Sequence, residues 1–79
     1  MIGLLDQLAA KHHVFISDLR LIPALRRESL GELQQMSQKE RYPLKEWEDA
    51  VSYLSGQIIR ISSKEDIDNV LTVSLYNLR

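Results

Sequence analysis

The stretch from Tyr42 to Ile61 constrains the fold of this chain most strongly. Pro43 has the fixed φ angle that suits the first position of a helix, and Gly56 can take the left-handed conformation that ends one. Between them, apolar residues recur at helical spacing, namely Leu44, Trp47, Val51 and Leu54. The run Ile58–Ile61 is rich in β-branched residues and predicts a strand. The stretch therefore predicts a helix with Trp47 in the core, a glycine stop and a strand.

Chain length and cysteine content limit what can hold the fold together. The 79 residues predict a single domain over residues 1–79, and a domain of this size buries only about 60–65% of the surface that its unfolded chain exposes. The chain has no cysteine, which excludes disulfides and thiolate metal sites and suits the reducing cytoplasm. Residues 1–10 lack the basic start of a signal peptide, and no apolar run approaches the roughly 18 residues of a membrane span. We therefore expect a cytoplasmic domain without a membrane segment.

The chain before Tyr42 predicts two helices separated by a short strand. One face of the opening helix carries Met1, Leu4, Leu5 and Leu8. The run Val14–Ile16 changes to β-branched and aromatic residues, which predicts a very short strand, and Ser17 or Asp18 would then turn the chain.

The start of the second helix has two possible positions. Pro23 cannot lie deep inside a helix without the loss of a hydrogen bond, so we predict that the helix begins at Pro23. The sequence Ser29-Leu30-Gly31-Glu32 also matches a capping box, in which serine and glutamate reciprocally satisfy backbone amides. A helix that begins at Leu30 is therefore the alternative.

The C-terminal stretch Val70–Tyr76 alternates between apolar and polar residues. Leu71, Val73 and Leu75 would share one face, which predicts a strand that pairs antiparallel with Ile58–Ile61. A helix is the rival reading, since one helical face would carry Ile67, Val70, Leu71, Leu75 and Leu78, with Ser62 and Glu65 as a possible cap. The crowding of β-branched residues in this stretch favours the strand.

The predicted order of elements is helix, short strand, helix, helix, strand, loop, strand. This order resembles the winged-helix superfamily, in which a helix-turn-helix is followed by a β-hairpin wing, and the resemblance is carried by Val14–Arg20, Pro43–Ser55 and Ile58–Tyr76. It implies an α+β fold, a small single domain that is winged-helix-like, with three helices and a C-terminal β-hairpin. The resemblance rests on the order of elements rather than on a motif, and the fold hosts several functions.

The charge of the chain bears on whether it binds DNA. Ten basic residues against eleven acidic ones give a net charge of −1, whereas DNA-binding domains are usually basic. In winged-helix DNA binders the third helix enters the major groove, and here its outward residues would be Lys45, Glu46, Glu48, Asp49, Ser52 and Ser55. Three carboxylates against one lysine would repel the phosphates. Candidate nucleic-acid contacts are therefore the basic residues nearer the second helix, together with that lysine: Arg20, Arg26, Arg27, Arg41 and Lys45.

Residues that could support catalysis or metal binding are scattered. His12 and His13 are adjacent, so their side chains diverge on either a helix or a strand and rarely bind one ion together. The three glycines form no phosphate-binding loop, and no nucleophile is paired with a base by a recognisable spacing. We expect no enzyme activity, no metal site and no cofactor.

Near-zero net charge and an acidic third helix favour a non-enzymatic protein-interaction or regulatory module, whose partner is another protein or a second copy. The alternative is a DNA-binding transcriptional regulator that uses the basic residues around the second helix. Tyr42, Tyr53 and Tyr76 are the candidate partner surface, because exposed aromatic residues often anchor interfaces. A continuous basic stripe would support DNA binding, and an exposed apolar patch would support a protein partner.

Overall fold

The computed structural model describes residues 3–77 and is entirely α-helical in its regular elements over that range, apart from one 3₁₀ turn. Its elements are α1 (Leu4–His12), α2 (Ile16–Leu21), α3 (Pro23–Gln35), the 3₁₀ turn η1 (Lys39–Arg41), α4 (Leu44–Ser55) and α5 (Lys64–Asn77). No strand occurs among residues 3–77. The predicted α+β fold with a C-terminal β-hairpin is therefore wrong, and the wing that the winged-helix resemblance requires is replaced by a helix.

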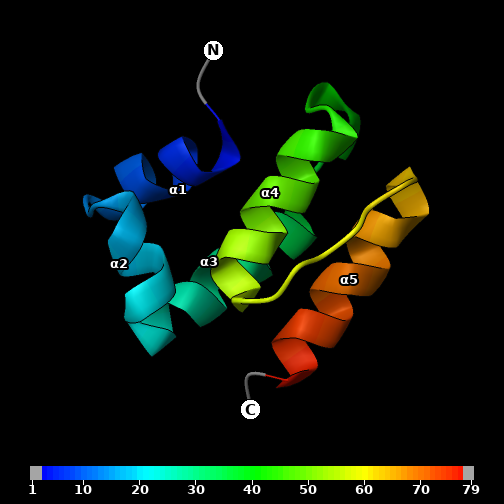
Figure 1. The fold of residues 1–79 in the computed structure, drawn as a ribbon. Coiled ribbons are helices and arrows are strands. Elements are labelled where there is room, and N and C mark those ends of the chain that lie inside the picture. The colour runs from blue at the N-terminus through cyan, green and yellow to red at the C-terminus, as the bar shows by residue number, and fades with distance from the viewer. Residues whose placement is uncertain (1–2, 78–79) are drawn as a thin grey trace.

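Helices α3 and α4 form the centre of the molecule. Helix α4 contacts each of the other four helices, α1 and α2 lie on one side of it, and α5 lies on the other (Figure 1). The fully buried side chains form one core and come from all five helices, including Leu4, Leu19, Leu30, Leu33, Trp47, Val51, Leu54, Ile67 and Leu71. The prediction that Trp47 is a core residue is confirmed, because none of its surface is exposed.

The predicted strand at residues 14–16 is wrong, because this segment joins two helices. His13 adopts the left-handed conformation with a φ angle of 56° and ends α1. The amide of Val14 donates to the carbonyl of Ala9 at 3.0 Å, and that of His13 donates to Ala10 at 3.3 Å, the pattern of a Schellman motif. Asp18 then accepts a hydrogen bond from the amide of Phe15 at 3.2 Å and fixes the start of α2. The apolar run is divided between a helix end and a helix start.

Helix α3 begins at Pro23, as predicted, and the alternative start at Leu30 is wrong. Ser29 lies inside the helix and is fully buried, so it caps nothing. Its Oγ has no hydrogen-bond partner among the described residues. A buried hydroxyl without a partner reduces stability.

Replacing Ser29 with alanine is expected to raise the free energy of unfolding by roughly 0.5–1 kcal/mol. Alanine has the higher helix propensity, and the substitution removes a hydroxyl that makes no hydrogen bond to a described residue. Thermal and urea unfolding followed by circular dichroism would measure the change. A loss of stability would mean that the hydroxyl has a partner, and would contradict the expectation.

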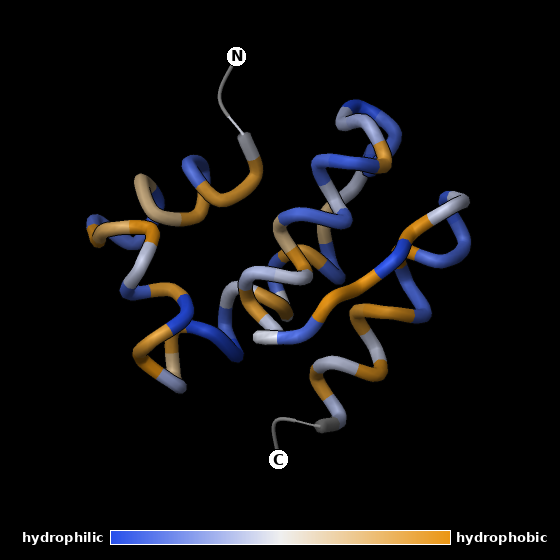
Figure 2. The backbone as a smooth tube through the Cα atoms, in the orientation of Figure 1, coloured by the Kyte–Doolittle hydropathy of each residue, from blue (hydrophilic) through white to orange (hydrophobic). Residues whose placement is uncertain are grey.

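The predicted strand at Ile58–Ile61 is also wrong, although its burial alternates as in an extended chain: Ile58 and Arg60 are exposed, and Ile61 is buried. Side chains of α4 bind the backbone of this segment. Ser52 Oγ accepts a hydrogen bond from the Ile59 amide at 2.9 Å and donates to its carbonyl at 3.3 Å. A carboxylate oxygen of Glu48 accepts from the Ile61 amide at 2.9 Å. Figure 2 shows this largely apolar connection between α4 and α5. Its β-branched residues lie against a helix instead of a second strand.

Residues 64–77 form α5, so the strand predicted for Val70–Tyr76 is wrong and the rival helical reading is right over the described residues. Leu78, which that reading also included, lies outside them. The cap lies one residue later than Ser62 and Glu65: the amide of Asp66 donates to Ser63 Oγ at 3.4 Å, and Asp66 accepts from the Ser62 amide at 3.1 Å. Burial of Ile67 and Leu71 against α3 and α4 outweighs the preference of Val70, Thr72 and Val73 for strands.

Side-chain and backbone contacts of the turn η1 connect α3 to α4 and α5. The amine of Lys39 donates to the carbonyls of Gln34 and Met36 at 2.8 and 2.9 Å and lies 3.3 Å from a carboxylate oxygen of Asp68. The indole nitrogen of Trp47 donates to the carbonyl of Lys39 at 2.9 Å. The Lys39 side chain is only 11% exposed, so it acts as a cap on α3 rather than as a solvated surface residue.

A second contact of η1 reaches the start of α5. Glu40 forms an ion pair with Lys64, with 3.3 Å between the nitrogen and oxygen atoms. A hydrogen bond from its own backbone, and then the Lys64 amine, hold the pKa of the Glu40 carboxyl below its usual value. Because both side chains are mostly exposed, this pair orients the turn more than it stabilises it.

Candidate functional site

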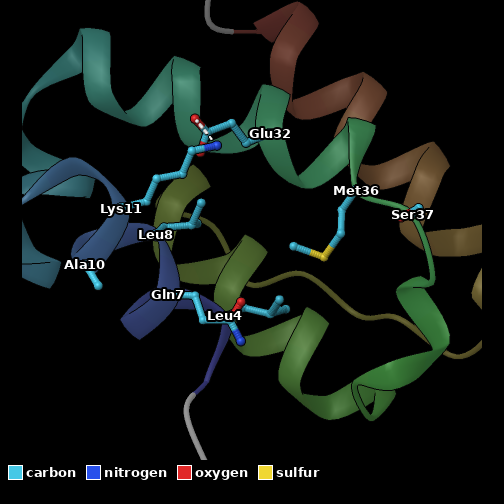
Figure 3. Close-up of a pocket in the computed structure, with 8 residues that line it drawn as sticks. All are labelled: Leu4, Gln7, Leu8, Ala10, Lys11, Glu32, Met36 and Ser37. Atoms are coloured by element: carbon cyan, nitrogen blue, oxygen red, sulfur yellow. Dashed lines mark ion pairs between the residues drawn. The ribbon is translucent and has the colours of Figure 1, made fainter.

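A large hollow on the described surface is a groove between α1 and the carboxyl end of α3, with a volume of about 750 Å³. Figure 3 shows its lining: Leu4, Gln7, Leu8, Ala10, Lys11, Glu32, Met36 and Ser37. The leucines belong to the buried core and form the floor, and the Met36 side chain points into the space. The volume falls within the range of small-molecule sites.

The charged groups of this groove satisfy one another. The Lys11 amine lies 3.3 Å from one carboxylate oxygen of Glu32, and His12 Nε2 lies 3.2 Å from the other. His12 is mostly buried, and its second ring nitrogen lies 4.0 Å from a Glu28 oxygen. These contacts join α1 to α3. The groove therefore presents no unpaired charge that would select a ligand.

The two histidines have separate structural positions, as expected from their adjacency. His12 contacts α3, whereas His13 is the left-handed residue at the end of α1. Among residues 3–77, no group of three or more histidine, aspartate or glutamate side chains is arranged to hold a metal ion.

A smaller hollow, which we name the arginine pocket, has a volume of about 180 Å³ and lies where α3, α5 and the end of α4 meet. It is lined by Arg26, Ser55, Gln57, Ile59, Val70, Val73 and Ser74. Among its apolar lining residues Val73 is 58% exposed, whereas Ile59 and Val70 are half-buried; Ile58, which follows Gln57 in sequence but is not part of the lining, is 89% exposed. We define the α5 patch as Ile58, Ile59, Val70 and Val73.

Arg26 is the one charged residue in the lining of the arginine pocket. Its Nε atom is buried and has no hydrogen-bond partner within the described part of the chain. Arg26 as a residue is half-buried, so this is one unpaired buried donor and not a buried unpaired charge. This unsatisfied donor distinguishes the arginine pocket from the groove beside α1.

Four of the predicted nucleic-acid contacts are divided between the two ends of α4. Arg20 and Arg26 lie near the carboxyl end of α4: a guanidinium nitrogen of Arg20 is 3.9 Å from the position that a Cβ on Gly56 would occupy, and Arg26 shares its pocket with Ser55. Arg41 and Lys45 lie at the other end of α4, whose 12 residues span about 18 Å. Arg27 is exposed on α3, beside Arg26 in sequence.

The outward face predicted for the third helix is partly occupied by the rest of the chain, whereas Lys45 and Asp49 on it are exposed, as predicted. Glu46 accepts a hydrogen bond from the Leu4 amide at 2.8 Å and caps α1. A Cβ on Gly3 would lie 2.5 Å from that carboxylate oxygen, so glycine permits the contact. Glu48 and Ser52 hold the segment after α4, as described above. Sequence spacing alone places these side chains in solvent, because it cannot show what packs beside the helix.

The three candidate tyrosines lie in separate places. The Tyr42 ring packs edge-on against Trp47 with 6.4 Å between centroids, and its hydroxyl accepts a hydrogen bond from Gln7. The Arg20 guanidinium lies 5.5 Å from the centre of the Tyr53 ring, a cation–π contact. Tyr76 is 67% exposed on α5, one turn after Val73. Of the three, only Tyr76 adjoins the α5 patch.

Sequence reasoning does not find the α5 patch, because it places Ile58 and Ile59 in one strand and Val73 on the inward face of another. The helical spacing from Val70 to Val73 is the signal that could have found it. Comparison with models of protein families, with curated proteins and with solved structures found no match. Function therefore has to be inferred from the side chains of this chain.

None of the helices between residues 3 and 77 is both long and apolar enough to span a membrane.

Proposed function

We propose that this chain is a non-enzymatic protein-interaction module, active in the cytoplasm, that binds its partner through the α5 patch. The observation that supports it is a pair of well-exposed apolar side chains, Ile58 and Val73, at a pocket whose lining also includes the half-buried Ile59 and Val70 and Arg26. Exposed apolar residues that stand alone need no explanation, but a cluster of them is typical of binding surfaces. Arginine at the centre of an apolar surface is common among residues that dominate binding energy.

Two features weigh against the alternative of a DNA-binding regulator. Four of the five candidate basic residues are divided between the two ends of α4, about 18 Å apart, and are not gathered in one cluster. The exposed Lys45 side chain also lies 3.8 Å from Asp49, which reduces its charge toward a phosphate. DNA binding usually needs several phosphate contacts along one surface.

A catalytic role has less support than a binding role. Within residues 3–77, no serine forms a hydrogen bond with a histidine, and neither the groove nor the arginine pocket has an unpaired carboxylate in its lining. General acid and base catalysis needs such groups positioned together. Both hollows instead combine apolar walls with polar rims, as binding surfaces do.

Site-specific photo-crosslinking in cells tests the proposal and does not require the partner to be identified beforehand. A photoreactive amino acid at position 58 or 73 is expected to form discrete crosslinked protein products. Position 45 is the matched control, because its side chain is 81% exposed and lies at the other end of α4 from Gln57 and Ile59. Crosslinks joining two copies of this chain would identify the partner as a second copy. Equal products from positions 58 and 45 would contradict the proposal.

Titration with duplex DNA provides the opposing measurement. If the DNA alternative holds, binding falls steeply as salt rises, since phosphate contacts release counterions. Loss of that binding in the Arg26→Ala/Arg27→Ala double variant, with no crosslinks at positions 58 and 73, would replace the protein-interaction proposal with the DNA alternative.

A further inference from the structure

We propose that residues 58–60 accept an extended segment of the partner protein as an added β-strand, with an acidic side chain opposite Arg60 and an apolar one opposite Ile58. This inference rests on the proposed function and adds the conformation and the chemistry of the partner. Three observations carry it: the extended shape of this part of the chain, its free backbone groups, and the side chains that it exposes.

The segment after α4 is held in an extended shape by α4 itself. Ser52 Oγ accepts a hydrogen bond from the amide of Ile59 and donates one to its carbonyl. Glu48 accepts one from the amide of Ile61. The bonded residues are two positions apart, as along one edge of a β-strand. Because the segment is already extended, it loses little conformational freedom when a second strand pairs with it.

The backbone groups of Ile58 and Arg60 face the edge away from α4, by the same alternation, and we name them the free edge. No group within residues 3–77 forms a hydrogen bond with the N–H or C=O of either residue. Both residues are exposed, and Ile58 is the more open of the two kinds of evidence at 89%. Unpaired N–H and C=O groups in a row are a template for another strand. In antiparallel pairing, each of the two residues can exchange two hydrogen bonds with the residue opposite it.

Open space lies beside this part of the chain. Gln57 and Ile59 of the segment form part of the lining of the arginine pocket, and Val73 of α5 forms another part, so the hollow lies between the segment and α5. In Figure 1 the segment, drawn in yellow, runs between α4 and α5 with no other element in front of it. Ile58 belongs both to the free edge and to the α5 patch. A strand paired with the free edge therefore lies beside the α5 patch.

The exposed side chains of the segment determine which partner strand fits. Ile58 and Arg60 are exposed, whereas Ile61 is buried and Ile59 is half-buried. Arg60 forms no ion pair with any residue in the described range. Side chains directly opposite each other in an antiparallel pair stabilise it when their charges are opposite or when both are β-branched. The partner therefore carries an aspartate or glutamate opposite Arg60 and, two positions later, a valine or isoleucine opposite Ile58.

A separate protein fits the free edge better than a second copy of this chain. Pairing of the two free edges would place Ile58 of one copy opposite Arg60 of the other, and both Arg60 side chains would lie on one face. Arg20 and Arg26 lie close to the start of the segment, near Gly56 and in the arginine pocket. Two copies would thus gather their arginines at the contact, and like charges oppose association. An acidic segment removes this repulsion.

Titration of the ¹⁵N-labelled protein with matched peptides tests this inference. The probe is a short peptide of β-branched residues, blocked at both ends, with a glutamate two positions before an isoleucine. In the first comparison peptide the backbone nitrogens of that glutamate and isoleucine are methylated, which removes the N–H donors of the pairing edge. In the second, the nitrogens of the residues directly after each of them are methylated, which removes donors that face away.

We expect the unmethylated peptide and the second comparison peptide to slow the hydrogen exchange of the Ile58 and Arg60 amides, measured by NMR. The first comparison peptide should bind about tenfold or more weakly, because it cannot form the bonds of the pairing edge. The Ile59 and Ile61 amides are already bonded to α4, so they are the internal reference and their exchange should change little. Binding that leaves the exchange of Ile58 and Arg60 unchanged would overturn the inference.

Arg60→Glu tests the acidic side chain. The unmodified protein should bind the glutamate peptide about threefold or more tightly than a peptide with lysine in its place, and the variant should reverse this preference. Arg41→Glu is the matched control, because Arg41 is exposed on η1, at the other end of α4, and should keep the preference for glutamate. Equal binding of the glutamate and lysine peptides by the unmodified protein would overturn the choice of an acidic partner.

The other outcomes separate this inference from the proposed function. Equal binding of the two methylated peptides, with shifts at Val73, would overturn strand addition and keep the α5 patch as the docking surface. No binding of the unmethylated peptide would overturn the inference, whereas the crosslinks from positions 58 and 73 would still decide the docking proposal by themselves. Protection of the Ile58 and Arg60 amides that rises with protein concentration, without peptide, would overturn the choice of a separate protein in favour of a second copy.

Discussion

Replacing Trp47 with alanine is expected to lower the free energy of unfolding by roughly 3–5 kcal/mol. The indole is fully buried among residues of the central helices and is the largest side chain in the core. Its removal leaves a cavity and deprives the Lys39 carbonyl of its hydrogen bond. Urea unfolding, monitored by circular dichroism, measures the loss. If the Trp47→Ala variant kept the thermal midpoint of the unmodified protein, the assignment of Trp47 to the core would be contradicted.

Trp47→Phe separates the two contributions. Phenylalanine retains most of the apolar volume but cannot donate to the Lys39 carbonyl, so we expect a smaller loss than for Trp47→Ala, about 1–2 kcal/mol. Equal losses in the two variants would mean that the hydrogen bond, rather than the buried volume, accounts for the effect.

Lys39→Met is the second substitution with a large expected effect, about 2–4 kcal/mol of lost stability. Methionine preserves the apolar stem but leaves the Gln34 and Met36 carbonyls without their donor and removes the contact with Asp68. Helix α3 then ends without its cap, and α5 loses an attachment. Chemical unfolding of the purified variant measures the change.

Lys45→Met is the matched control for this experiment. The Lys45 side chain is 81% exposed and forms an ion pair with Asp49 in the next turn of α4, so its replacement should change stability by less than about 0.5 kcal/mol. If Lys39→Met were as mild as the control, the role of Lys39 as a cap would be refuted.

Helix α4 can be predicted from sequence because its signals are local. Gly56 takes the left-handed conformation with a φ angle of 75°, as expected, and the apolar spacing faces the core. Pro43 lies one residue before the helix rather than at its first position. A proline and a glycine restrict the backbone whatever packs around them.

The predicted strands are wrong because β-propensity measures fit to a packed surface rather than backbone conformation. Ile58–Ile61 is extended, but the groups that satisfy its amides are side chains 13 or fewer residues away, on α4. Val70 and Val73 occur in a helix whose stability comes from burial of Ile67 and Leu71. Neither outcome can be read from a short stretch of sequence.

The candidate site depends on tertiary contacts even more than the secondary structure does. The sequence identifies Arg26 as a basic residue that could bind phosphate, but its pocket exists only because the ends of α3 and α4 meet the side of α5. The sequence alone shows that position 26 carries a positive charge. It cannot show that Arg41 lies elsewhere, or that Glu46 and Glu48 are engaged within the chain.

The hydrogen bonds that Glu48 and Ser52 form with the backbone of Ile61 and Ile59 also occupy groups through which an extended segment could pair with another chain. Ile58–Ile61 has the high β-propensity and low charge of segments that add to cross-β assemblies, and such assemblies grow through free backbone amides and carbonyls. The side chains of α4 occupy some of those groups, much as a neighbouring strand would. If α4 unwinds, these backbone groups lose their partners, so we expect loss of that helix to leave the edge of residues 58–61 that faces α4 free to pair with another chain.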